Sequence, residues 1–122
     1  MINRRKFLLN SSSAFALTQL PSNAYAKNGI KHYRLVAEAA EHTFYPSAQK
    51  SKLSLYNQQS PGPTIHAVKD DILEVEFLNL LDEPTTIHWH GIRNLNDMDG
   101  VPGLTQPAVE PGETFTYRFP LK

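Results

Sequence analysis

The sequence predicts an all-β domain. Nine prolines and six glycines separate short apolar runs, and several of these runs alternate apolar with polar residues. Alternation with a period of two is typical of half-buried strands, and proline and glycine mark the turns between them. The pattern fits about six strands, so we expect an antiparallel sandwich or a Greek-key barrel.

Composition narrows the classes of function. The chain has 122 residues, which is room for one domain. Its 12 basic and 12 acidic residues balance, so no patch for nucleic acid or an anionic membrane is expected. It contains no cysteine, which excludes disulfides, zinc-thiolate sites and thiolate-ligated copper within the chain.

Residues 1–26 are predicted to be a signal peptide. Basic residues at 4–6 precede a weakly apolar stretch at 7–20, and Ala24 and Ala26 give a cleavage site before Lys27. The stretch is too short and too rich in serine to span a bilayer. Residues 3–8 (NRRKFL) resemble the twin-arginine motif, which implies a bacterial protein exported by that machinery to the periplasm or beyond. An ordinary secretory signal is the alternative.

The expected strands follow in order along residues 27–122. The stretch 31–43 fits helix or strand, and we expect a strand because the rest of the chain has β patterns. The stretch 52–57 alternates cleanly, and 58–63 (QQSPGP) is a turn. The clearest strand is 72–80, with Leu73, Val75 and Phe77 facing inward.

Two further strands lie on either side of a long loop at 93–107. The first, 85–91 (TTIHWHG), is supported by the β-branched Thr86 and Ile87. The second, 113–119, places Phe115, Tyr117 and Phe119 on one face.

His88 and His90 form the candidate metal site. Residues two apart in a strand share a face and lie about 6.6 Å apart along the backbone, so Ile87 and Trp89 would face the core instead. Two imidazoles could chelate one metal ion or each bind one of two neighbouring ions, and imidazole suits copper, zinc, iron and nickel. Two ligands are too few for a tight site. The alternative is a pair of ordinary surface histidines.

Residues 86–92 (TIHWHGI) resemble the first copper motif of the multicopper oxidases. The similarity extends in order through 60–65, 71–79, 98–103 with 105–106, and 110–113 with Phe115, Tyr117 and Phe119. It implies a cupredoxin-like Greek-key β-sandwich or barrel. Residues 27–122 would then be an N-terminal plastocyanin-like (cupredoxin) domain, and we expect it to be incomplete at its C-terminus.

The resemblance also implies roles for three residues. His88 would ligate the type 2 copper and His90 a type 3 copper of a trinuclear cluster, which residues outside this chain would complete. Asp99 would be a catalytic group that relays protons to reduced oxygen, while its alternative role is that of a turn former before Gly100. O2 and a reducing substrate, either a phenol or a metal ion, would be the partners. His32, His42 and His66 lie outside the family's ligand positions.

Three other interpretations remain open at this point. The chain could be a non-enzymatic cupredoxin-like envelope protein, or a copper-binding remnant without oxidase activity. It could also be a different β-fold metalloenzyme with one zinc or iron, such as a cupin or a β-sheet carbonic anhydrase. We expect the 122-residue chain alone to be inactive, because it carries only one histidine motif.

Overall fold

The computed structural model describes residues 29–45 and 49–122. The predicted signal peptide, residues 1–26, lies outside the described residues. In the described part of the chain, no helix is long and apolar enough to cross a membrane.

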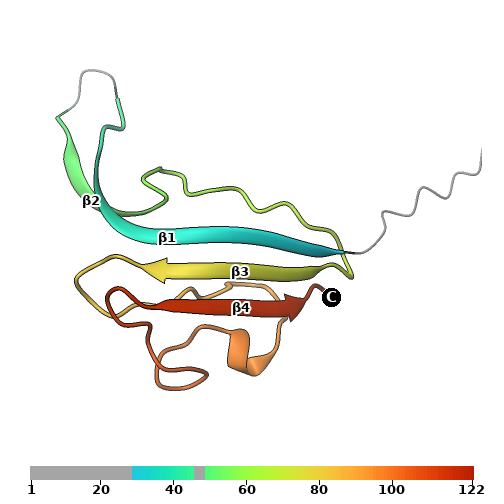
Figure 1. The fold of residues 1–122 in the computed structure, drawn as a ribbon. Helices are drawn as coiled ribbons and strands as arrows, with labels where there is room; N and C mark the ends of the chain where they lie inside the picture. Colours follow the sequence, from blue (N-terminus) through green and yellow to red (C-terminus); the bar gives the residue numbers. More distant parts are fainter. Residues whose placement is uncertain (1–28, 46–48) are drawn as a thin grey trace, which may run out of the picture.

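Four strands form one sheet in the order β2-β1-β3-β4 (Figure 1). They are β1 (Ile30–His42), β2 (Ser51–Tyr56), β3 (Ile72–Asn79) and β4 (Thr114–Pro120). The all-β prediction is confirmed, and each of these strands was expected within one or two residues of its observed ends.

The expectation of a purely antiparallel sheet is wrong for one pair. β1 pairs with β2 antiparallel through its C-terminal half, and with β3 in parallel from Ile30 to Ala37. The reason lies in the connection: residues 57–71 run back along the sheet, so β3 starts at the same end as β1 (Figure 1). β3 and β4 are antiparallel.

The core lies on one face of β3 and β4. Val75, Phe77 and Tyr117 have no exposed surface, and Leu73 and Phe119 are almost fully buried. These are the residues that alternation predicted to face inward. The core therefore confirms the predicted faces of both strands.

The predicted strand at 85–91 is wrong. Thr85 makes one isolated bridge, with Val109, and no strand follows it. Beyond that bridge the N–H of Ile87 donates to a side chain, the hydroxyl of Tyr117, at 2.9 Å and not to a neighbouring strand. The N–H of Ile92 then closes a turn onto the carbonyl of Trp89. The histidine segment is therefore held by side chains and not by a sheet ladder.

Asn79, at the end of β3, holds both ends of the loop that carries the histidines. Its side-chain amide donates to the carbonyls of Glu83 and Val109, both at 2.9 Å, and its carbonyl oxygen accepts the N–H of Leu81. The side chain is fully buried. Since each of its polar atoms is paired, burial is compatible with a stable fold.

Asp71 makes a similar anchor at the start of β3. Its carboxylate accepts the N–H groups of Gly29 and Val68 at 3.0 and 2.9 Å, and Lys31 lies 3.8 Å away. These two backbone hydrogen bonds lower the pKa of Asp71, more than its burial raises that pKa.

Candidate metal centre

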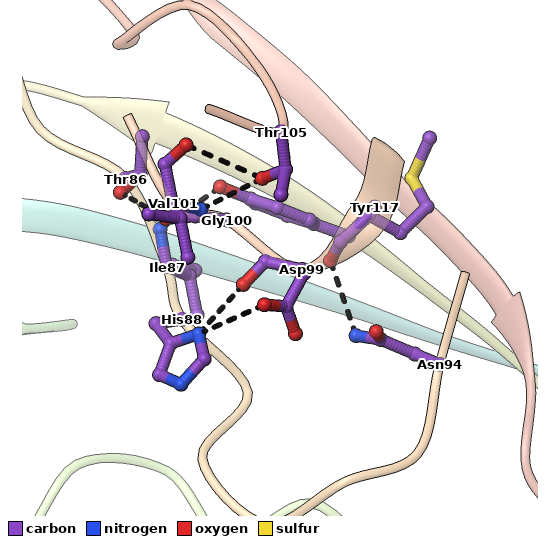
Figure 2. Close-up of polar contacts among 10 residues, drawn as sticks. Thr86, Ile87, His88, Asn94, Asp99, Gly100, Val101, Thr105 and Tyr117 are labelled. Carbon is purple, nitrogen blue, oxygen red and sulfur yellow. Dashed lines mark hydrogen bonds and ion pairs between the residues drawn. The ribbon is translucent and has the colours of Figure 1, made fainter. Parts of the chain in front are cut away.

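Three contacts position the backbone before His88. The Thr85–Val109 bridge carries two backbone hydrogen bonds, at 3.1 and 2.8 Å. The hydroxyl of Thr86 donates to the carbonyl of Gly100 at 2.7 Å (Figure 2). With the Ile87–Tyr117 contact, each residue from 85 to 87 is tied to a different part of the fold.

Gly100 lets the two sides of the site approach closely. Its φ is +76°, and a Cβ there would overlap the backbone carbonyl of Ile87. Only glycine fits both the left-handed conformation and the contact. The loop that follows η2 (Asn96–Met98) therefore packs directly against the histidine segment.

His88 is oriented by Asp99. Its ring Nδ1 lies 2.8 Å from the backbone carbonyl of Asp99 and 3.7 Å from the carboxylate oxygen Oδ2 (Figure 2). A carbonyl oxygen can only accept, so Nδ1 is the donor, and in the neutral tautomer that donates there Nε2 carries the lone pair. This is the arrangement of a metal-binding histidine, whose second ring nitrogen donates to a carbonyl or carboxylate.

His90 lies beside His88. The ring centroids are 5.8 Å apart and the ring planes are inclined by 72°. Both side chains are exposed, His88 by 46%. The prediction that they share one side is thus confirmed, although the segment is not a regular strand.

Trp89 packs on the other side, as expected. Its ring contacts Tyr117 and Phe119 edge-on, with centroids 5.6 and 5.4 Å apart. Ile87 next to it is 7% exposed. The alternation that divides the histidines from the core therefore survives the loss of sheet pairing.

The donor set fits copper but is incomplete. Two imidazoles on one side of an exposed segment are suitable ligands for copper, zinc, iron or nickel. Among the described residues, no group of three or more His, Asp or Glu side chains could hold a metal ion. His32 lies elsewhere, against Glu74 at 2.9 Å on the sheet. His42 contacts Phe44.

The sequence did not indicate the roles of three residues that position the site. Tyr117 was predicted to be buried, and a buried tyrosine needs a partner for its hydroxyl, but nothing indicated Ile87. Burial raises the pKa of this hydroxyl, although the N–H of Ile87 and the side chain of Gln106 oppose that shift. Thr86 was interpreted as a strand former, and Met98 only as part of a motif.

The fold and the paired imidazoles together define a β-domain that presents two neighbouring histidines suited to metal binding. The family model for multicopper oxidases matches residues 38–122. The chain belongs to the multicopper oxidase family, and its fold is cupredoxin-like.

Individual relatives also support the assignment to the multicopper oxidase family. Laccase-1 of Emericella nidulans is 44% identical over 97 residues, which is 75% of this chain and 16% of that protein. L-ascorbate oxidase of Brassica rapa subsp. pekinensis is 47% identical over 78 residues, 62% of this chain and 14% of that protein. The chain thus spans less than a fifth of either relative.

A solved structure is also similar. The multicopper oxidase of Pseudomonas thermotolerans superimposes with a TM-score of 0.71 at 42% identity, covering 75% of this chain and 22% of that one. At this identity the comparison supports the family as well as the fold.

Proposed function

We propose that this chain contributes His88 and His90 as copper ligands to an exported multicopper oxidase. That enzyme couples one-electron oxidation of a phenol or a metal ion to reduction of O2 to water. The observation that carries the proposal is the hydrogen bond from His88 Nδ1 to the Asp99 carbonyl, at 2.8 Å. It leaves Nε2 free on the exposed side of the segment, beside His90.

Bound copper would supply electron transfer to O2. The residues of this chain would hold the metal and supply a proton next to it. His88 and His90 hold the metal, and the remaining ligands come from residues outside this chain. The Asp99 carboxylate is partly exposed and 3.7 Å from His88 Nδ1, so it can hold a proton next to the site without being a ligand. This is the role we assign to Asp99.

The export part of the proposal depends on residues 3–8 and 24–26. A twin-arginine signal carries folded proteins, which would allow copper to be loaded before or after export. The test is to replace Arg4 and Arg5 by lysine and to measure export. A twin-arginine signal should lose export, whereas an ordinary secretory signal should be unaffected.

The competing function is a copper-binding or envelope protein without oxidase activity. The test is to purify the protein from the cells that make it and measure its intact mass, copper content and O2 uptake with a phenol and with Fe(II) or Cu(I). We expect a mass above 13.8 kDa, several coppers and O2 uptake with one substrate class. Bound copper without O2 uptake would favour a copper-binding protein, and a metal-free protein would favour an envelope protein; either result would contradict the proposed oxidase.

A further inference from the structure

The outer edge of β4 is occupied by a sulfur atom. β4 is the last strand of the sheet, so within residues 29–45 and 49–122 no strand pairs with that edge. The backbone N–H of Arg118 donates there to the thioether sulfur of Met98 at 3.3 Å. Thioether sulfur is a weak acceptor, so the contact needs a well-placed side chain.

Met98 is held in place from three sides. Its carbonyl accepts the side-chain amide of Asn94 at 3.2 Å, and its N–H donates to the carbonyl of Leu95 at 3.0 Å. Its side chain is half-buried and packs against the hydrophobic core. A displacement of β4 or of the sulfur would therefore move the end of η2.

Asp99 lies between two such anchors. Met98 before it is tied to Arg118, and Gly100 after it is tied to Thr86. A shift of about 1 Å at the Asp99 carbonyl would take its 2.8 Å contact with His88 beyond hydrogen-bond range. We propose that Met98 is a positioning residue, whose sulfur holds the Asp99 carbonyl within hydrogen-bond distance of His88 Nδ1.

The inference rests on the proposed function only in treating His88 as a copper ligand. The hydrogen bonds themselves can be tested without copper. In the natural chain, the Thr116 N–H is the internal control, because residues two apart in β4 direct their N–H groups to the same edge. We expect the Arg118 amide to exchange with solvent about tenfold more slowly than that of Thr116. Equal exchange would overturn the proposal even if every variant failed to fold.

The variant is Met98→Leu, which keeps the volume and removes the acceptor. We expect faster exchange at Arg118 and a measurable rise, by nitrogen-15 NMR, in the His88 fraction protonated on Nε2. The natural chain labelled with selenomethionine keeps an acceptor at position 98 and should leave both values unchanged; the chain has only two methionines, at positions 1 and 98. Leu104→Ala, at an exposed side chain in the same loop, should change neither.

A packing role for Met98 makes a different prediction. Met98→Leu would then lower the free energy of unfolding and leave the His88 tautomer unchanged, which would overturn the inference. A normal NMR result with no copper binding would instead overturn the proposed function alone.

Discussion

The hydroxyl of Tyr117 accepts the backbone N–H of Ile87 at 2.9 Å, one residue before the first candidate ligand. Tyr117 has no exposed surface. A residue of β4 thus replaces the sheet partner that the histidine segment lacks, and it directs Ile87 into the core while His88 points outward.

Tyr117→Phe should therefore destabilise the fold by about 1–3 kcal/mol, because it leaves a buried N–H without an acceptor. Urea denaturation measures the change. Tyr33→Phe is the matched control: its hydroxyl also contacts backbone, at His66, but in an exposed position where water can substitute. Equal losses of stability in the two variants would show that the Ile87–Tyr117 hydrogen bond contributes no more than the exposed contact of Tyr33.

Gly100→Ala should disrupt the site more than Gly112→Ala. Both glycines have a positive φ, +76° and +82°, so alanine costs about 1–2 kcal/mol of backbone strain at either position. A Cβ on Gly112 would meet nothing within 4 Å, whereas on Gly100 it would overlap the Ile87 carbonyl.

The difference between the two unfolding free energies therefore isolates the close approach of the two loops. We expect Gly100→Ala to be at least about twice as destabilising as Gly112→Ala and to weaken the His88–Asp99 contact, read from the His88 tautomer. Similar losses at both glycines would contradict the packing described for Gly100.

Acid should destabilise the domain in part through Asp71. Its folded-state pKa lies below the ordinary value of 3.8 because the N–H groups of Val68 and Gly29 favour the carboxylate. A lowered folded-state pKa stabilises the fold above the unfolded-state pKa, and this stabilisation disappears as the pH falls from about 4 through the folded-state pKa.

Asp71→Asn should be less stable than the natural chain at pH 7, because an amide cannot accept from two N–H groups with two oxygens. Its stability should also depend less on pH below 4. Asp70→Asn is the neighbouring control, since Asp70 is exposed and asparagine tolerates its φ of +70°. Denaturation curves at several pH values measure the free energy of unfolding of each protein. If that free energy depended on pH in the same way for Asp71→Asn and the natural chain, the role assigned to Asp71 would be contradicted.

Asp99→Asn should slow O2 reduction in the copper-loaded oxidase without loss of copper. The contact that orients His88 comes from the backbone carbonyl, at 2.8 Å, and asparagine keeps it. Only the carboxylate, 3.7 Å from Nδ1, is changed. Metal analysis together with O2 uptake measures both effects, and unchanged turnover would remove Asp99 from the proton relay.

The sequence predicted what depends on local alternation. Val75, Phe77 and Tyr117 face the core and His88 faces away from it, as a period of two requires. The pairing partners of the strands could not be predicted from local patterns, because they depend on tertiary contacts. The parallel β1–β3 pair results from the connection between the strands, and the segment at 85–91 is held by side-chain hydrogen bonds.

The sequence indicated the candidate ligands but not the residues that support them. His-x-His and the Asp99-Gly100 pair are visible as motifs, and a glycine at a close approach can be expected in such a turn. The hydroxyls of Thr86 and Tyr117 and the sulfur of Met98 find partners 14, 30 and 20 residues away, where no local pattern points.

The most direct test is the copper content of the protein, purified from the cells that make it, in three variants: His88→Ala, His90→Ala and His66→Ala. His66 is exposed and lies outside the histidine pair. We predict that copper falls in the first two variants, with His88→Ala also losing the type 2 signal in electron paramagnetic resonance, and stays unchanged in the third. Full copper content in His88→Ala and His90→Ala would contradict the assignment of these two residues as ligands.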